Sequence, residues 1–506
     1  MGSPTAPRRT SPTRIHARRI LKKVFGLEEF RPGQAAIISS ILEGHDTVGI
    51  MPTGAGKSLC YQIPALLLHG TTLVISPLIS LMKDQTDKLV EMGLAVSSVN
   101  STLTRAEEIE HLDRIVNERA EFVLTTPERL VTTEFGEMLQ RTNVDFVVVD
   151  EAHCVSQWGH DFRPAYLEIK DAIAALATGR KRRPRILALT ATAPEQVLTA
   201  ICSELGLVDP RIVNTGIYRP NLEYQVLRTV NDDQKREHLI RLLRDADGTG
   251  IVYAATVRQV ETLHELLNGM VGDVAKYHGR MSASERRQHQ ERFMSGEVRA
   301  MVATNAFGMG IDKPDVRFVI HYNMPGSLEA YYQESGRAGR DGQPSRCVLF
   351  YQLEDRRTQL YFMGGRYPKS DEIAAVYAVL QRLGAGRRAV PVDEVKSSIG
   401  ELVAPTRVRV VLSLLKDLEI AKSIRGGTIV LLNHTLSPAN LAAVSDAYRA
   451  RQSTDRDKLE QMMRYGQSAG CRWALLLEYF GESFQERCGT CDNCTTPLET
   501  QIAQPA

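Results

Sequence analysis

The chain has 506 residues, of which 43% are hydrophobic and 24% are charged. This length exceeds what one hydrophobic core supports, so we expect several domains, and the composition is that of an ordinary globular protein. The net charge is only +2, so no global attraction to nucleic acid is predicted. No apolar run approaches the ~20 residues that a membrane-spanning helix needs, and we expect no membrane partner.

The N-terminal segment is rich in Pro, Ser, Thr and Arg. Seven Lys and Arg residues and no acidic residue precede Val24, and the segment lacks the apolar core of a secretory signal. We expect residues 1–20 to form a disordered basic tail.

Two stretches of the chain alternate apolar β-branched runs with helical patterns, which predicts parallel sheets with crossover helices. The runs carry almost no polar alternation, so we expect strands that are buried on both faces. In the first predicted domain, residues 21–215, the expected strands are Thr47–Met51, Thr71–Ser76, Phe122–Thr125, Asp145–Asp150 and Arg185–Thr190. In the second, residues 216–369, they are Gly250–Tyr253, Ala275–Tyr277, Ala300–Ala303, Phe318–Tyr322 and Cys347–Tyr351. The predicted class is α/β, with two parallel-sheet domains.

Past residue 370 the pattern changes to short amphipathic helices. The first expected helix has Ser370 as its N-cap and stops at Gly384. A second lies around 392–399, and a third begins after Pro405-Thr406 and is followed by a hairpin around 425–427. Three helices and a hairpin predict a winged-helix-like α+β module over residues 370–434, with the third helix as candidate DNA reader. The side chains of that helix that we expect to face inward are Val408, Val411, Leu415 and Leu418.

The remaining segment, residues 435–496, is expected to be a helical zinc-binding subdomain. It contains a long helical pattern to about Tyr465, a short helix over Cys471–Tyr479 and a cysteine-rich loop. We expect residues 497–506 to be a disordered tail.

The segment Met51–Ser58, MPTGAGKS, stands between an expected strand and a helix, which is the context of a phosphate-binding loop. In such a loop the backbone N–H groups cradle phosphates, Lys57 holds the β/γ charge and Ser58 ligates magnesium. Met51 stands where the general pattern has its first glycine, and a simple glycine-rich turn is the plainer alternative. The expected nucleotide-binding residues of the loop are Thr53, Gly54, Gly56, Lys57 and Ser58.

Asp150 and Glu151 follow the expected strand 145–150 directly. Parallel sheets place their ligands at the carboxyl ends of strands. We expect Asp150 to hold magnesium, and Glu151 to orient or deprotonate the attacking water. A solvated acidic strand end is the alternative, but Lys57 disfavours it because the three residues together form a hydrolytic site.

The second domain contributes Arg337 and Arg340 within the sequence QESGRAGR. Three residues apart on a helix, they would face the same way, and we expect both to be catalytic. Guanidinium groups from a second domain neutralise charge on the transferring phosphate only when the cleft closes, which couples hydrolysis to motion. Arg340 is the first choice as arginine finger. Taken alone, the pair would fit a solvated helix face.

The eight cysteines fall into two sets. Four are dispersed, and the other four crowd near the C-terminus with the spacing C-x16-C-x2-C-x2-C. This pattern favours a reducing cytoplasm and a structural zinc site over disulfides. The expected zinc ligands are Cys471, Cys488, Cys491 and Cys494.

Together these motifs resemble the RecQ family of superfamily-two helicases over residues 21–494. The further stretches that carry the resemblance are 30–34, 76–85, 126–130, 156–164, 188–193 and 303–314. The resemblance implies that the two α/β domains are RecA-like motor domains of an ATP-dependent 3′–5′ DNA helicase, which acts in recombination, repair or replication-fork processing. It implies ATP, Mg²⁺ and Zn²⁺ as cofactors and single-stranded or tailed duplex DNA as partner. We expect a monomer that is cytoplasmic, or nucleoid-associated in a bacterium.

The resemblance also implies roles for individual residues. Gln34 would read the adenine edge with help from Arg31, and Asp312 would act in the ATP cleft. Trp158 and Phe162 would stack on unpaired bases. The full set of implied DNA contacts is Trp158, Phe162, Arg163 and Thr304.

The order of the C-terminal parts departs from the family. RecQ proteins typically place the zinc site before a winged helix, and here the expected module at 370–434 precedes the cysteines. Two interpretations of the module stay open, a rearranged DNA-binding domain and a protein-contact insert. The alternative function is a DNA-dependent ATPase that acts as a translocase or conformational scaffold without unwinding.

Overall fold

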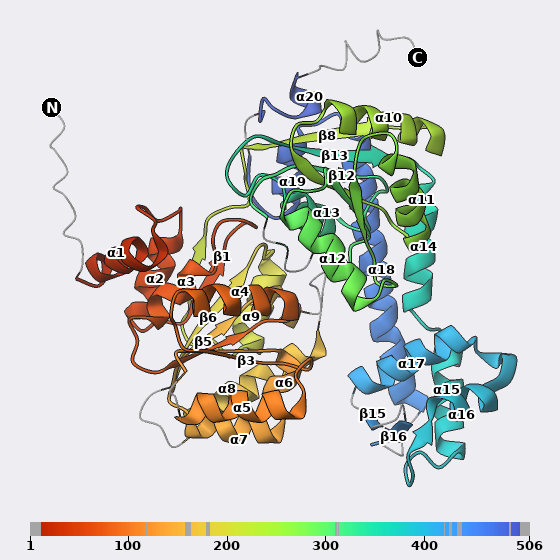
Figure 1. The fold of residues 1–506 in the computed structure, drawn as a ribbon. Helices are drawn as coiled ribbons and strands as arrows, with labels where there is room; N and C mark the ends of the chain where they lie inside the picture. Colours follow the sequence, from red (N-terminus) through yellow and green to blue (C-terminus); the bar gives the residue numbers. More distant parts are fainter. Residues whose placement is uncertain are drawn as a thin grey trace.

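The computed structural model describes residues 12–117, 120–156, 163–178, 183–308, 311, 313–418, 420–424, 428–432, 438–484 and 487–495. Figure 1 shows two α/β domains, the first drawn in red to yellow and the second in green to teal. A smaller helical module lies beyond the second domain, and a long blue helix connects that domain to the module. Among the described residues, no helix is both long and apolar enough to cross a membrane.

The first domain is built on a seven-stranded, all-parallel sheet in the order β3-β4-β2-β5-β6-β1-β7. The strands are β1 (Thr47–Ile50), β2 (Thr71–Ile75), β3 (Val96–Val99), β4 (Phe122–Thr125), β5 (Val144–Val149), β6 (Arg185–Thr190) and β7 (Arg211–Asn214). Separate hydrophobic clusters cover the two faces, which explains the continuous apolar runs of the central strands. The helices are α1 (Pro12–Phe25), α2 (Gln34–Leu42), α3 (Leu59–Ala65), α4 (Ile79–Glu91), α5 (Arg105–Asn117), α6 (Pro127–Leu130), α7 (Thr133–Arg141), α8 (Ile169–Ala177) and α9 (Glu195–Glu204).

The second domain repeats this architecture with a six-stranded parallel sheet in the order β10-β11-β9-β12-β13-β8. Its strands are β8 (Leu222–Arg228), β9 (Thr249–Tyr253), β10 (Val274–Tyr277), β11 (Ala300–Ala303), β12 (Val316–His321) and β13 (Ser345–Tyr351). Its helices are α10 (Asp232–Asp245), α11 (Val257–Asn268), α12 (Ala283–Met294), α13 (Leu328–Ser335) and α14 (Asp355–Arg366). The expectation of two RecA-like motor domains is confirmed.

Three strands of the two sheets, β3, β7 and β8, were not expected from the sequence. All three are edge strands of their sheets. An edge strand is not covered on both faces, so its sequence alternates or is polar: β3 reads VSSV, and β7 reads RIVN with three of its four residues exposed. The expectation of a disordered tail over residues 1–20 is wrong for residues 12–20, which belong to α1. Ala17 and Leu21 of α1 are buried against Ile38 and Ile63, and this burial stabilises the helix.

In its described residues, the module after residue 370 contains three α-helices, a short 3₁₀ helix over Gly400–Leu402 and a small antiparallel sheet in the order β14-β16-β15. Its elements are α15 (Ser370–Arg382), β14 (Val390–Pro391), α16 (Val392–Ile399), α17 (Pro405–Asp417), β15 (Ala421–Ile424) and β16 (Thr428–Leu431). Its core includes Val408, Val411 and Leu415 of α17. Two details differ from expectation. Lys369, not Ser370, is the N-cap of α15, and Leu418 is 42% exposed because it follows the last turn of α17 and leaves the apolar stripe.

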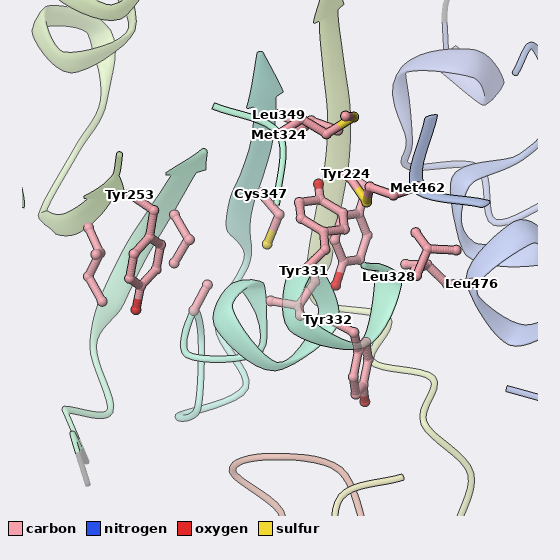
Figure 2. Close-up of a cluster of buried hydrophobic side chains, with 14 of the residues drawn as sticks. Tyr224, Tyr253, Met324, Leu328, Tyr331, Tyr332, Cys347, Leu349, Met462 and Leu476 are labelled. Carbon is pink, nitrogen blue, oxygen red and sulfur yellow. The ribbon is translucent and has the colours of Figure 1, made fainter. Parts of the chain in front are cut away.

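The C-terminal segment consists of α18 (Pro438–Gln467), α19 (Arg472–Tyr479) and α20 (Asp492–Thr495). Helix α18 contacts α15 of the module at one end and α13 and α14 of the second domain at the other. Met462 of α18 and Leu476 of α19 lie beside Tyr224 and Tyr331 in the core of the second domain (Figure 2). The zinc-binding subdomain therefore shares its core with the second motor domain.

Candidate active site

A cavity of about 390 Å³ lies between the two motor domains. The first domain contributes the phosphate loop, the strand end at Asp150 and the segment around Arg31, while the second contributes the turn after α13. Of the residues expected to bind or hydrolyse nucleotide, those that line this cavity are Arg31, Gln34, Thr53, Gly54, Gly56, Lys57, Ser58, Asp150, Glu151, Arg337 and Arg340. Asp312 lies outside the described residues. The structure thus brings the two arginines of the second domain to the phosphate loop of the first.

The phosphate loop joins β1 to α3. Met51, which replaces the usual first glycine, is fully buried beneath the loop, where its Sδ accepts a hydrogen bond from Cys60 Sγ at 3.6 Å. Its backbone N–H donates to the carbonyl of Thr190 at 3.0 Å. A side chain is tolerated at this position because it points into the core, away from the cavity. Gly54, with φ +84, forms the tight turn of the loop, so Met51 does not have to adopt a glycine conformation.

Gln34 and Arg31 connect the start of α2 to the phosphate loop. The Gln34 amide nitrogen donates to the carbonyls of Gly56 at 2.9 Å and Ala55 at 3.2 Å, while its oxygen accepts the N–H of Arg31 at 2.9 Å. Arg31 Nη1 donates to the carbonyl of Gly54. Both residues line the cavity, and the reading of an adenine edge by Gln34 stays a prediction.

The acidic pair follows β5, as expected. Burial, reinforced by the charge of Glu151, raises the pKa of Asp150 to about 7, while Lys57 opposes the shift. Ser76 Oγ donates to Asp150 Oδ2 at 3.4 Å. The buried Glu151 Oε2 accepts no hydrogen bond within the described parts of the chain, although His153 Nδ1 lies 3.4 Å away. Buried negative charge that is incompletely compensated suits a hard divalent cation, for which Asp150 and the Ser58 hydroxyl offer oxygen ligands.

The two arginines lie on a turn rather than on the helix that the sequence suggested. Helix α13 ends at Ser335, and a turn over residues 336–340 carries both side chains. Arg337 is only 7% exposed and donates from Nη1 to the carbonyl of Gly308. Arg340 packs against the phosphate loop, because a Cβ added to Gly54 would lie 2.9 Å from Arg340 Cγ.

The four C-terminal cysteines, which the spacing predicts as zinc ligands, lie together in the structure. Their four Sγ atoms all lie within 4.8 Å of one another. The distance between Cys488 Sγ and Cys494 Sγ is 3.8 Å, which equals the ~3.8 Å edge of a tetrahedron with Zn–S bonds of ~2.3 Å. Backbone N–H groups donate to Cys471, Cys488 and Cys491 at 3.3 to 3.4 Å. Burial raises the pKa of Cys488, but backbone hydrogen bonds from residues 490 and 491 outweigh it and lower the pKa to about 7. These residues fit Zn²⁺.

Family models match parts of both motor domains and the segment that contains the four C-terminal cysteines. Residues 31–200 match the DEAD/DEAH box helicase model, residues 234–342 the helicase conserved C-terminal domain and residues 435–495 the RecQ zinc-binding domain. The chain is 36% identical over 480 residues to the ATP-dependent DNA helicase RecQ of Bacillus subtilis, covering 95% of this chain and 67% of that protein. It is 35% identical to the probable ATP-dependent DNA helicase RecS of the same organism, covering 94% and 90%. The chain belongs to the RecQ family of DNA helicases.

The extent of these matches varies among RecQ proteins. The chain spans 62% of the length of the Pasteurella multocida RecQ helicase, to which it is 35% identical over 94% of this chain. A solved structure, the DUF1998 helicase MrfA bound to DNA, covers 84% of this chain and is itself covered over 63%, with a TM-score of 0.56 and 18% identity, which supports the fold. The expected cofactors of a RecQ chain, ATP, Mg²⁺ and Zn²⁺, fit the sites described above.

The residues that the RecQ resemblance assigned to DNA are only partly described. Trp158 and Phe162 lie outside the described residues. Arg163 donates from Nη1 to the carbonyl of Pro77 at 3.1 Å and so contacts the segment 76–85. Thr304 follows β11 and is 8% exposed. Their contacts with phosphate stay predictions.

Sequence reasoning missed two polar residues near the arginines of this RecQ-family site. Arg219 and Asn221 lie between β7 and β8, and both donate hydrogen bonds to carbonyls of the turn at 336–340. Their acceptors are more than 100 residues away along the chain, so no local spacing pattern marks them. The only sequence signal is a polar Arg-Pro-Asn triplet where the two motor domains join.

Proposed function

We propose that the chain is an ATP-dependent DNA helicase that moves 3′ to 5′ along single-stranded DNA and separates duplexes ahead of it, in recombination, repair or replication-fork processing. The observation that carries this proposal is the shared cleft. Lys57, Asp150 and Glu151 come from the first motor domain, and Arg337 and Arg340 come from the second. Hydrolysis in such a cleft depends on how closely the domains approach, so each turnover changes their relative position.

Each of the named residues of the cleft has its own role in ATP hydrolysis. The ammonium of Lys57 neutralises the β- and γ-phosphates, and Ser58 and Asp150 would hold the Mg²⁺, which supplies further neutralisation of phosphate charge. Glu151 orients a water and accepts its proton as the water oxygen attacks the γ-phosphorus and the bond to the bridging oxygen breaks. The guanidinium groups of Arg337 and Arg340 stabilise the charge that develops on the transferred group. The products are ADP and phosphate.

A hydrogen-bond connection leads from this chemistry toward the proposed DNA track. His153, two residues after Glu151, lies 3.1 Å through Nδ1 from Thr190 Oγ1, which itself donates to the carbonyl of Thr192 at 2.9 Å. The segment 188–193 is one of the stretches that resemble RecQ helicases, and the resemblance implies that it lies along the DNA track or between that track and the ATP site. We propose that this connection couples the conformation of Asp150 and Glu151 to the bound DNA strand.

The decisive experiment measures strand separation on fluorescent duplexes that carry either a 3′ or a 5′ single-stranded tail, with ATP and Mg²⁺. Glu151→Gln serves as the inactive control, because the amide cannot accept the proton from water. Separation of the 3′-tailed duplex alone, lost in the control, supports the proposal. DNA-stimulated ATP hydrolysis without separation of either duplex would favour the translocase or scaffold alternative. Undiminished hydrolysis after Lys57→Ala would remove the phosphate-loop assignment.

A further inference from the structure

Arg219 is a buried arginine, 8% exposed, at the junction of the two motor domains. Its Nη1 donates to the carbonyl of Gly336 at 2.7 Å, and its Nη2 donates to the carbonyls of Ala338 at 2.7 Å and Gly339 at 2.6 Å. All three acceptors belong to the turn after α13. One guanidinium therefore binds carbonyls on both sides of Arg337 and the carbonyl immediately before Arg340.

Asn221 holds the same turn from the adjacent position. Its Nδ2 donates to the carbonyls of Gly339 at 2.8 Å and Gln343 at 2.9 Å. Gly339 has φ +53, and a Cβ there would stand 2.5 Å from Asn221 Nδ2. The turn is thus fitted closely onto the junction, and its left-handed residue leaves no room for a side chain.

The junction between the two motor domains, residues 217–222, is itself held by the zinc-binding subdomain. The N–H of Ile217 donates to Glu482 at 3.1 Å, and Trp473 Nε1 donates to the carbonyl of Leu222 at 3.1 Å. The ring of Tyr218 packs edge-on against Trp473 with 4.9 Å between centroids. Because both ends of the junction are held, Arg219 has a fixed position from which to hold the turn.

We propose that Arg219 is a positioning residue for ATP hydrolysis, which holds the turn 336–340 so that Arg337 and Arg340 enter the nucleotide cleft. The inference rests on the proposed function, since it concerns the same reaction. A buried guanidinium that loses its acceptors is strongly destabilising, so turn conformations that release Arg219 are disfavoured. Arg219 does not line the cleft. Arg219 therefore affects hydrolysis only through Arg337 and Arg340, which stabilise the charge of the transition state.

The test compares Arg219→Gln and Arg219→Lys with wild type in steady-state ATP hydrolysis with single-stranded DNA, alongside the affinity for a fluorescent ATP analogue. We expect Arg219→Gln to lower kcat on the order of 10- to 100-fold and to change KM and analogue affinity less than about twofold, since misplaced transition-state contacts act on kcat. Arg219→Lys should recover part of kcat. In a chain that already carries Arg337→Ala and Arg340→Ala, Arg219→Gln should add little further loss. A full additional loss in that triple variant, or an effect on KM alone, would overturn the proposal.

A second measurement does not depend on catalysis. Hydrogen exchange of the amides at 336–340, followed without nucleotide, should be faster in Arg219→Gln than in wild type, while exchange in β11 stays unchanged. Unchanged exchange at the turn would contradict the proposal. If Arg219→Gln fails to fold, the milder Arg219→Lys takes its place, with smaller changes expected in the same directions and the same contradicting result. A wild-type chain that does not hydrolyse ATP would refute the proposed function, and the exchange data would still report whether Arg219 holds the turn.

Discussion

Gly54 of the phosphate loop and Arg340 of the second motor domain are in direct contact across the nucleotide cleft. A Cβ built on Gly54 would stand 2.9 Å from Arg340 Cγ and 3.3 Å from its Cβ. The finger arginine therefore packs against the loop that is expected to hold the phosphates. Closure of the cleft depends on the absence of a side chain at this glycine.

Gly54→Ala should lower the rate of ATP hydrolysis by keeping the domains apart. At φ +84 an L side chain costs roughly 1–2 kcal/mol, and the added methyl group also meets Arg340. We expect kcat to fall on the order of tenfold at saturating ATP. Gly136→Ala is the matched control, because Gly136 lies within α7 with nothing within 4 Å of an added Cβ. Equal kcat in the two variants would refute a role for this contact.

Arg340→Ala should remove a transition-state contact without abolishing nucleotide binding. The expected loss in kcat is on the order of 10³-fold, as for other arginine fingers. Single-turnover hydrolysis and the binding of a fluorescent ATP analogue would separate chemistry from binding. The exposed Arg346 on β13 provides the control variant Arg346→Ala, for which we expect wild-type turnover. Near-normal kcat in Arg340→Ala would transfer the finger role to Arg337.

Cys491→Ser should release zinc and loosen the second motor domain. Cys491 is fully buried, and its neighbour Arg472 bonds Asp492, which accepts the N–H of Val226 in β8 at 2.9 Å. We expect loss of stoichiometric zinc in a metal assay, a lower Tm and a red shift in the emission of the buried Trp473. Cys202→Ser, remote from the cluster in α9, should retain zinc and Tm. Full zinc content in Cys491→Ser would refute the four-cysteine site.

The buried Asp150 should make stability depend on pH when Mg²⁺ and nucleotide are absent. Burial raises its pKa to about 7 in the folded chain, whereas an unfolded aspartate titrates near ~3.9. Between these values the folded state holds a proton that the unfolded chain has lost, so the free energy of unfolding falls as pH rises toward ~7 and then stays low. Asp150→Asn should therefore raise Tm at about pH 8 and much less at about pH 5. An equal change at both values, or the same gain in the exposed control Asp171→Asn, would contradict this origin.

The central parts of the fold and site could be predicted from the sequence because their causes are local. β5 and β6 are buried on both faces and therefore read as continuous apolar runs, and the phosphate loop, acidic pair and cysteine cluster each have their residues at fixed short spacings. The edge strands β3, β7 and β8 lack that signature.

Contacts between segments that are far apart in the chain leave no local pattern in the sequence. Arg219 was missed because its partners are backbone carbonyls, which any residue supplies. The arginines at 337 and 340 were placed on a helix by their spacing, but the helix ends at Ser335, and Gly339, with φ +53, takes the left-handed conformation that the following turn requires.

The module at 370–434 can be tested as a DNA contact through α17. Arg409 and Lys416 are exposed on this helix, whereas Arg407 donates to the carbonyl of Tyr367 at 2.8 Å and is committed within the protein. If the module grips phosphate, Arg409→Glu with Lys416→Glu should weaken DNA binding and reduce the salt-dependence slope by about 2. Ser413→Ala on the same exposed face is the control. Unchanged affinity and slope would favour the protein-contact interpretation.

Helix α18 has a mechanical consequence. It is a single element of 30 residues, anchored at one end in the core of the second domain and in contact with the module at the other. At 1.5 Å per residue it is roughly 45 Å long, so a tilt of about 10° at the anchored end would carry the far end through roughly 8 Å. The helix would thus act as a lever arm, and small movements at the ATP cleft would become large excursions of the module.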